Sequence, residues 1–599
     1  MKHDKYKWLG SALCLALILV MASCSMSDDM ECPPDNGGEG QQVYVQLRLT
    51  VPSSGQGTRA GDTPEGGEEN NEGREEGQEY ENTISSALVF FYRADNNINA
   101  DGSTPIDEYA SFTVSGMENG NYVTNPVQVP LEFNTTYNLI AVANPGNDGR
   151  WERLAADGLT LAEVRDNIST QVWTETGDVE KVYSNFMMSS EDGSEKLTVT
   201  DANTSPDNPA GRNTSIYVER IAARLDYQVD NEYTCNDPQY PGARVVINGA
   251  AILNRFTAGS YLIKRVTIDN KLDGSVTYLG DEEPANGGMA TNYVIDPWTL
   301  TKNESNNSFT LPDADGRLAG TQVDAAGLYD AETYIPTRSD NPEDWAGYCK
   351  PGVDATEDNY LRVGYALENT TGKLETSLNY NTGIVFKAQF HPVGVNGYTD
   401  GQTFFTYNGV IYPMLTDMMG QLNGQEDFST HVGKAIAALT SWDELKKFAA
   451  SITNDPTGYR TYLEDYANTH SAEAFNTSDE LKWEYYLIYE LGVFENSQDG
   501  PEINKNDINT RNVLYESSGE KLRTYYKGQC YYVWWLRHSN NNDDTTNGVM
   551  EYAIVRNNIY KVNVTGVYSL GGDIPGDEEL RANVYVKDWE GLDPETLPM

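Results

Sequence analysis

The chain has 599 residues, a formal net charge of −48 and 39 tyrosines. This length exceeds what one hydrophobic core supports, so we expect at least two domains, and the tyrosine content favours β structure. The strong acidity argues against nucleic acid and anionic membrane surfaces as partners, because both attract clustered Lys and Arg.

The N-terminus has the pattern of an export signal over residues 1–24. Lys2, Lys5 and Lys7 precede an apolar run over 9–21, and Ala22-Ser23-Cys24 follows. A basic start, a short apolar stretch and small residues before a cleavage point are typical of a secretory signal. Because Cys24 directly follows Ala-Ser, this end resembles a bacterial lipobox, which implies that Cys24 carries lipid. An ordinary signal peptide with an incidental Cys24 is the alternative.

The remaining cysteines and histidines do not form a motif of known chemistry. Cys235, Cys349 and Cys530 are odd in number, far apart and without C-x-x-C spacing, which argues against a disulfide framework and a zinc site. One disulfide among them stays open. The five histidines contain no H-E-x-x-H, and no G-x-S-x-G or phosphate loop is present. An enzyme therefore has little motif support, although composition alone does not exclude a glycosidase carboxylate pair.

The first predicted strand covers residues 43–51. Apolar and polar residues alternate there, so one face carries Val43, Val45, Leu47, Leu49 and Val51. We expect residues 25–59 to contain a tether and this strand.

A Gly- and Glu-rich run follows from Arg59-Ala60 to about Glu81. Its composition predicts an exposed loop open to proteases, since it offers nothing to bury. Arg59 is the candidate cleavage point in this loop, and Arg74 is the nearest competitor.

Short alternating segments separated by turn residues predict a mainly β protein built of β-sandwiches. We expect one sandwich over residues 60–212 and a second over 213–570. A short helix is predicted over 161–168, and the capping boxes Ser441–Glu444 and Thr477–Glu480 predict a helical insertion over about 414–518. The expected strands cover 87–92, 109–113, 127–133, 137–142, 215–227, 245–252, 261–268, 383–390, 403–412, 528–536 and 555–564.

The chain ends with a hinge and one more strand over residues 571–599. A Gly/Asp/Pro segment over 571–577 precedes a strand over 582–589. A terminal strand on a flexible hinge need not pair in its own domain, so a neighbour is a possible recipient. An ordinary last strand of its own sandwich is the alternative.

Two further patterns have simpler explanations. Residues 97–102 with Glu108 approach calcium-loop spacing, but the flanking strands favour a hairpin loop. The aromatic cluster over 531–535 offers sugar-stacking rings, but consecutive residues on a strand point to opposite faces, so core packing accounts for half of them.

Eight motifs follow one another along nearly the whole chain. They are the lipobox, Thr58-Arg59-Ala60-Gly61-Asp62, Val218-Glu219-Arg220-x-x-Ala223-Arg224, Ile384-Val385-Phe386-Lys387-Ala388-x-Phe390, Tyr407-Asn408-Gly409 with Tyr412, Tyr531-Tyr532-x-Trp534, Val555-Arg556-Asn557-Asn558-Ile559-Tyr560 and Val584-Tyr585-Val586-x-x-Trp589. In this order they resemble the motifs of the fimbrillins of type V pili, and specifically of the main-shaft subunit of the short fimbriae. The helical insertion after Tyr412 departs from the best-known member of that family, in which this connection is short.

The resemblance implies two tandem transthyretin-like β-sandwiches and a precursor held in the outer membrane as a lipoprotein. It also implies that an Arg-specific protease cuts the bond between Arg59 and Ala60. This cut removes residues 25–59 on maturation, frees the strand over 43–51 and empties a groove. The C-terminal strand of another copy would fill that groove by strand addition. Val584, Tyr585, Val586 and Trp589 are the candidate donor residues.

The implied partners are other copies in a head-to-tail extracellular fimbria, accessory pilus subunits and a host or bacterial receptor; no cofactor or nucleic acid is implied. Two alternatives remain: an anchor or tip subunit of the same pilus, and a monomeric surface lipoprotein that binds glycans. In an uncut precursor, we expect residues 43–51 to lie in the groove and the C-terminal strand to lie outside it.

Overall fold

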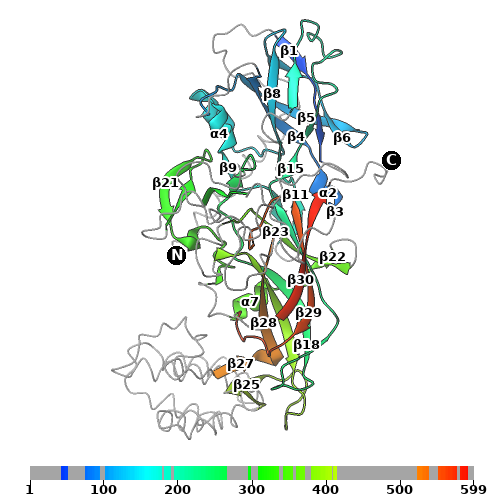
Figure 1. The fold of residues 1–599 in the computed structure, drawn as a ribbon, viewed down its shortest axis with the longest axis vertical. Helices are drawn as coiled ribbons and strands as arrows, with labels where there is room; N and C mark the ends of the chain where they lie inside the picture. Colours follow the sequence, from blue (N-terminus) through cyan, green and yellow to red (C-terminus); the bar gives the residue numbers. More distant parts are fainter. Residues whose placement is uncertain are drawn as a thin grey trace, which may run out of the picture.

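The structure is a computed structural model that describes residues 42–51, 74–94, 102–177, 181–190, 195–265, 294–298, 308–335, 342–354, 359–370, 380–407, 409–413, 522–538, 551–575 and 580–590. Over these ranges the chain is mainly β, which confirms the predicted fold class (Figure 1). None of the described helices is long and apolar enough to cross a membrane.

The N-terminal part is built around a nine-stranded sheet. Near-continuous apolar sequence in its central strands explains why they are buried on both faces. The strand order is β14 (Ser215–Tyr217), β2 (Arg48–Thr50), β6 (Asn121–Thr124), β5 (Glu108–Glu118), β4 (Ser86–Arg93), β8 (Thr136–Ala143), β12 (Met188–Ser189) and β15 (Glu219–Arg220), with β13 (Glu195–Thr198) also on β8.

Smaller elements complete this part of the molecule. Thr160 and Glu163 form a capping box that starts α4, with the Thr160 N–H donating to Glu163 Oε2 at 2.9 Å. The elements are β1 (Gln42–Val45) with β7 (Val127–Pro130), β10 (Thr174–Thr176) with β11 (Val182–Ser184), β9 (Ile168–Ser169) with β19 (Ser260–Tyr261), α2 (Glu79–Asn82), α3 (Arg150–Ala156) and α4 (Leu161–Arg165).

The C-terminal part is a sandwich of two sheets whose apolar faces share one core. One sheet has the order β22 (Val353–Asp354), β23 (Leu361–Ala366), β16 (Ala223–Gln228), β29 (Asn558–Val567), β30 (Leu580–Glu590) and β3 (Arg74–Glu76). The other has the order β17 (Tyr233–Thr234), β18 (Arg244–Leu253), β24 (Gly383–His391) and β28 (Gln529–Trp535).

Further elements lie at the two ends of this sandwich. In Figure 1, β21 lies beside the junction of the two parts, whereas β25 and β27 lie at the far end. Phe256, Trp298 and Leu328 belong to the N-terminal core, so the connection between β18 and β24 helps to join the two parts. These elements are β20 (Phe309–Pro312), β21 (Leu318–Val323), η1 (Ala325–Gly327), α7 (Pro342–Tyr348), β25 (Phe404–Tyr407), β26 (Val410–Tyr412), β27 (Leu522–Tyr525) and η6 (Tyr526–Gly528).

Most of the expected strands coincide with strands of the structure, with shifted ends. The expected segment over 43–51 is two strands, β1 and β2, and the segment over 215–227 is three, β14 to β16. The predicted helical insertion over 414–518 lies outside the described residues. The division into domains at residues 212 and 570 stays a prediction.

Candidate functional site

The first part of the candidate site is the segment 42–51, which we name the leader strand. Its apolar side chains point into the N-terminal core: Val43, Val45, Leu47 and Leu49 are fully buried, and Val51 is 6% exposed. β1 pairs antiparallel with β7, and β2 lies between β6 and β14. The leader strand is therefore an internal strand, although the chain reaches it first.

Backbone hydrogen bonds hold the leader strand on both sides. The Thr124 N–H donates to the Leu47 carbonyl at 3.0 Å from the side of β6. On the other side, the Ala210 N–H donates to the Tyr44 carbonyl at 2.7 Å, and the Gln46 N–H donates to the Ala210 carbonyl at 2.9 Å. Without this strand, the two walls of the groove would present unpaired backbone groups and an apolar floor.

Gly211 allows the leader strand to lie close to the side of the groove that contains Ala210. Gly211 has φ of +79°, and a Cβ atom there would lie 2.9 Å from both the Gln46 carbonyl oxygen and Leu47 Cδ2. A side chain at this position would displace the leader strand.

The second part of the site is β30, the C-terminal strand, which lies outside the groove that the leader strand fills. It pairs antiparallel with β29 of its own chain, from Asn558–Asp588 to Val567–Leu580. Val584 is 1% exposed and Val586 is fully buried in the C-terminal core, while Tyr585 is half-buried on the other face. Without β30, the backbone groups along this edge of β29 would be unpaired. The alternating apolar residues of β30 also fit the adjacent core, which explains why β30 pairs within its own chain.

A flexible hinge was expected before β30, but its first described residues are held by hydrogen bonds. The Gly572 N–H donates to the Tyr531 carbonyl at 2.9 Å and the Tyr531 N–H donates back to the Gly572 carbonyl at 2.8 Å. The hydroxyl of Tyr525 donates to the Gly571 carbonyl at 3.0 Å. These bonds hold Gly571 and Gly572 against β27 and β28, and the φ of +81° at Gly571 allows the close approach.

The third part is the segment Arg74–Asn82, which contains β3 and α2 and lies where the two parts of the molecule meet (Figure 1). The prediction of an exposed loop is wrong here: Glu75 is 3% exposed, and Glu81 and Asn82 are buried. Acidic composition suggested solvent exposure, but buried cations from distant strands provide the countercharge. The sequence did not predict that these carboxylates are buried, because their cationic partners are distant in sequence.

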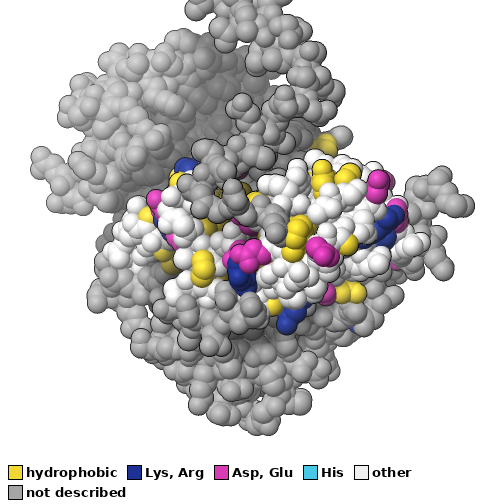
Figure 2. All heavy atoms as spheres, turned by 90° about the horizontal axis from the view of Figure 1, so that it is seen from above, with side chains coloured by type: hydrophobic (Ala, Val, Ile, Leu, Met, Phe, Trp, Pro, Cys, Tyr) yellow, Lys and Arg dark blue, Asp and Glu magenta, His cyan; other side chains and the backbone are white. Residues whose placement is uncertain are grey.

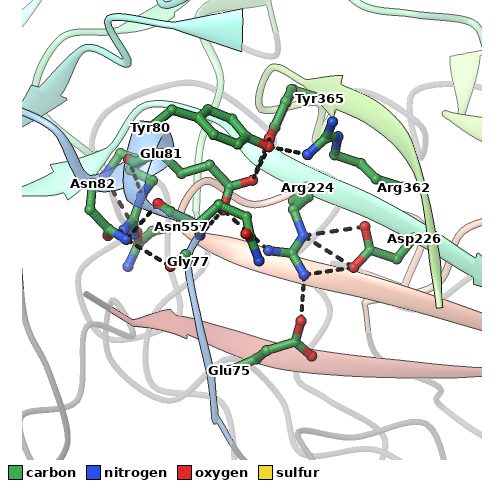
Figure 3. Close-up of polar contacts among 12 residues, drawn as sticks. Glu75, Gly77, Tyr80, Glu81, Asn82, Arg224, Asp226, Arg362, Tyr365 and Asn557 are labelled. Atoms are coloured by element: carbon green, nitrogen blue, oxygen red, sulfur yellow. Dashed lines mark hydrogen bonds and ion pairs between the residues drawn. The ribbon is translucent and has the colours of Figure 1, made fainter. Parts of the chain in front are cut away.

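Glu75 lies among cations from three neighbouring strands. Its carboxylate accepts from Arg224 on β16 (Figure 3). It also accepts from Lys561 on β29. Lys587 Nζ on β30 lies 3.6 Å from Glu75 Oε2. Arg224 and Lys561 are almost completely buried, so the arrangement is an internal ion-pair network.

Glu81 continues this network across the junction. Its carboxylate lies 3.2 Å from Arg224 Nη1 and accepts from the Tyr365 hydroxyl. Asp226 contacts the same guanidinium at 2.8 Å, so Arg224 meets carboxylates of β3, α2 and β16 (Figure 3). Burial opposes the charge of Arg224, but the carboxylates of Asp226, Glu81 and Glu75 raise its pKa overall.

Arg220 connects α2 to β29. Its Nε donates to the Glu81 carbonyl at 3.0 Å, its Nη1 donates to Asn557 Oδ1 at 3.0 Å, and its Nη2 donates to Asn82. Burial lowers the pKa of Arg220 to about 10, and Glu81 opposes this change. The guanidinium stays charged at neutral pH.

The motifs that suggested the family meet at this junction. Arg220 and Arg224 come from the motif over 218–224, and Asn557 comes from the motif over 555–560. Arg556 of the second motif is buried and pairs with Glu368 at 2.5 Å. The sequence predicted that these motifs matter, but their proximity follows only from the fold.

The lipidation and cleavage candidates, Cys24, Arg59 and Ala60, lie outside the described residues. Arg74, the competing cleavage point, is the first residue of β3 and pairs with Asp588 in the parallel ladder of β3 and β30. Trp589 of β30 is opposite Glu75 in that ladder.

The aromatic cluster of β28 contributes mainly to packing. Tyr531 and Tyr532 are fully buried on opposite faces of the strand, and Trp534 and Trp535 are half-buried. Cys235, Cys349 and Cys530 are buried thiols that do not form disulfides with one another. In the described part of the chain, no group of His, Cys, Asp and Glu is arranged to hold a metal ion.

Figure 2 views the molecule from above the N-terminal part. On the described portion of this face, apolar side chains are scattered among polar and charged ones and do not form one large patch. With the leader strand in place, the apolar residues of the groove are therefore covered rather than presented at this surface.

Comparison with known families identifies the C-terminal region. Residues 523–593 match the family model described as major fimbrial subunit protein type IV, fimbrillin, C-terminal. This region resembles the C-terminal domain of fimbrillins. The match covers β28, β29 and β30 and confirms the resemblance to the fimbrillins that the sequence motifs suggested.

The solved structures with similarity to this chain are distant from it in sequence. A Parabacteroides distasonis protein assigned to cell adhesion shares 12% identity over 92% of this chain and 100% of its own, with a TM-score of 0.36. A C-terminally truncated tip fimbrial protein of Porphyromonas gingivalis shares 10% identity over 92% and 100%, with a TM-score of 0.30.

A fimbrilin of Porphyromonas gingivalis shares 12% identity over 92% of this chain and 98% of its own, with a TM-score of 0.30. Because these scores and identities are low, the assignment depends on the family match. Among curated proteins, no sequence matches the chain.

Proposed function

We propose that the chain is a structural subunit of a cell-surface fimbria and that it polymerises by strand exchange. The observation that carries this proposal is the leader strand, an internal strand of the N-terminal sheet that precedes the candidate cleavage bond between Arg59 and Ala60. A strand held in this way can be removed by one cut, and its removal leaves a groove that requires a replacement.

The C-terminal strand has the pattern that such a groove accepts. The leader strand buries Val43, Val45, Leu47, Leu49 and Val51, and β30 buries alternate aliphatic residues in the same way. Each such side chain contributes roughly 1.5–3 kcal/mol when fully buried. The buried aliphatic residues of β30 are Leu580, Ala582, Val584 and Val586.

The exchange requires β30 to leave its own sheet. The released strand would lose its pairing with β29 but regain a backbone ladder and buried valines in the neighbour's groove. Because groove and donor strand lie on different parts of one chain, contacts between copies are head-to-tail and do not close, which generates a filament.

The export route completes this proposal. A precursor with lipid on Cys24 would reach the outer membrane, and an Arg-specific protease would release the leader strand at Ala60 and yield an extracellular fimbria. Other copies and accessory pilus subunits would be the partners. The chain has both a cleavage candidate and a C-terminal strand, and this combination favours a shaft subunit over an anchor or a tip subunit.

A peptide-binding experiment tests strand exchange directly. The precursor is cut with an Arg-specific protease, separated from its leader, and mixed with a labelled synthetic peptide of the sequence Leu580–Glu590. We expect the peptide to bind the cut chain and not the uncut precursor, because only the cut chain has an empty groove.

A control peptide carries Val584→Asp and Val586→Asp, and we expect it not to bind, since each Asp would place a charge in an apolar pocket. Equal binding of the peptide to cut and uncut chains, or binding to neither, would contradict the proposal.

A further inference from the structure

We propose that Arg74–Asn82, which we name the clasp, is an internal inhibitory contact that keeps β30 in its own sheet, with Glu75 as the positioning residue. This inference rests on the proposed function, because it concerns when the C-terminal strand becomes available to another copy. The clasp lies on the C-terminal side of the candidate cleavage bond, so it stays with the mature chain.

The clasp covers the outer edge of β30. In the sheet order of the described residues, β30 has β29 on one side and β3 on the other. β3 runs parallel to β30, with Arg74, Glu75 and Glu76 opposite Asp588, Trp589 and Glu590. A strand between two neighbours has to break both ladders before it can leave.

Glu75 provides the attraction at this contact. Its carboxylate is the shared partner of Arg224, Lys561 and Lys587, which come from β16, β29 and β30. Arg224 has further carboxylate partners in Glu81 and Asp226, whereas Lys561 also lies 4.2 Å from the ring centroid of Tyr360. Without the charge of Glu75, the ammonium groups of Lys561 and Lys587 would face each other and Arg224 across adjacent strands.

A second set of contacts fixes the clasp independently of β30. Arg220 donates to the Glu81 carbonyl and to Asn82, and the Tyr365 hydroxyl donates to Glu81. These partners come from β15 and β23. Because α2 is held there, β3 cannot simply follow β30 when it moves, and release of β30 has to break the contact between Lys587 and Glu75.

The cost of breaking this contact favours the retained state. Lys587 is mostly buried and Glu75 is almost fully buried, and a charged pair inside a protein is screened less than one at the surface, so their separation costs free energy. The clasp therefore resists premature release of the C-terminal strand from an unassembled subunit.

Hydrogen exchange on the uncut full-length chain tests the clasp without any polymerisation. In Glu75→Gln, we expect amides of residues 580–587 and of β29 to exchange about tenfold to a hundredfold faster than in the wild type, because local opening of β30 becomes easier. Amides of β18 and β24 should be unchanged. Glu76→Gln is the matched control, since Glu76 is an exposed neighbour on the same strand.

Lys587→Ala provides an independent variant that should fold, because Lys587 is partly exposed. We expect the same localised increase with a smaller amplitude. Unchanged exchange over residues 580–587 in both variants would overturn the clasp, and so would a uniform increase across β18, β24 and β30.

Different measurements test the clasp and the proposed function, so either can be contradicted without the other. Localised exchange without peptide binding by the cut chain would support the clasp and contradict strand exchange. Peptide binding without any effect of Glu75→Gln or Lys587→Ala would support strand exchange and overturn the clasp.

Discussion

Single acidic residues have two different functions in this chain. Most of the 90 Asp and Glu residues give the protein its net negative charge. A few are buried as counterions, and Glu75, Glu81 and Asp226 surround one guanidinium, that of Arg224. Replacing one member of such a network leaves a buried charge without compensation, so these positions are sensitive even though they lie outside the apolar core.

Glu108 predicts a pH-dependent stability. Burial, together with the charge of Asp107, raises the pKa of Glu108 to about 7. Its folded-state pKa lies above the unfolded value, so the folded chain binds the extra proton, and stability falls as pH rises through about 4.5 to 7. Glu108→Gln should therefore stabilise the protein at pH 8 by about 1 kcal/mol, after allowance for solvent screening, and have no effect at pH 4.

Thermal unfolding at the two pH values checks this expectation, with exposed Glu152→Gln as the control. About 1 kcal/mol corresponds to roughly 2–4 °C in a domain of 150–250 residues. An equal effect of Glu108→Gln at pH 4 and pH 8 would contradict the role of its ionisation.

Gly211 predicts a steric effect on the leader strand. Gly211→Ala should destabilise the uncut chain by about 1–3 kcal/mol more than a glycine substitution in open space, because the added Cβ meets Gln46 and Leu47. Gly158→Ala is the matched control: Gly158 has φ of +81°, and a Cβ added there would meet nothing within 4 Å. Equal loss of stability in the two variants, measured by denaturant unfolding, would show that the groove tolerates a side chain at position 211.

At the scale of strands and helices, short apolar segments bounded by turn residues predicted the sheet strands well. The segments over 87–92, 137–142 and 383–390 are β4, β8 and β24, because their apolar sequences allow few other buried arrangements. The short strand β3 and the helix α2 were not predicted. Their stability comes from Arg220, Arg224 and Lys561, which are distant in sequence, so no local pattern contains the information.

The C-terminal strand shows a second limit on what a sequence pattern can predict. Alternation predicted β30 itself, but the same alternation fits its own sheet and a neighbour's groove equally well. Pairing with β29 and burial of Val584 and Val586 settle its position in the single chain. A truncation after Leu580 would remove part of the core, so peptide binding is a cleaner test of the donor strand than truncation.

The position of β3 predicts which arginine is cut. Arg74 belongs to a ladder with β30 and Glu75 is buried, so a protease would have to unfold the clasp before it could cleave there. Arg59→Lys should therefore abolish cleavage by an Arg-specific protease under native conditions, whereas Arg74→Lys should not change it. N-terminal sequencing checks the products, and a new N-terminus at Glu75 in the folded wild-type chain would contradict this prediction.

At the scale of the whole molecule, the six-stranded sheet of the C-terminal part meets the N-terminal part at the buried hydrogen bonds and ion pairs of Arg220, Arg224 and Arg556. This junction contacts the clasp, which lies between the candidate cleavage bond and the C-terminal strand's outer edge. Local alternation predicted a mainly β molecule, and the resemblance to the fimbrillins implied that its first strand is removed. The charged contacts at this junction join residues that are distant in sequence, so only the structure reveals them.

The central claim is that one cut exposes a groove that another copy fills. The most direct measurement cuts the purified uncut chain with an Arg-specific protease and follows it by N-terminal sequencing and electron microscopy. We predict a new N-terminus at Ala60, loss of the leader strand and the appearance of fibres. A chain that is cut at Ala60, has lost its leader strand and remains monomeric would contradict the proposed assembly.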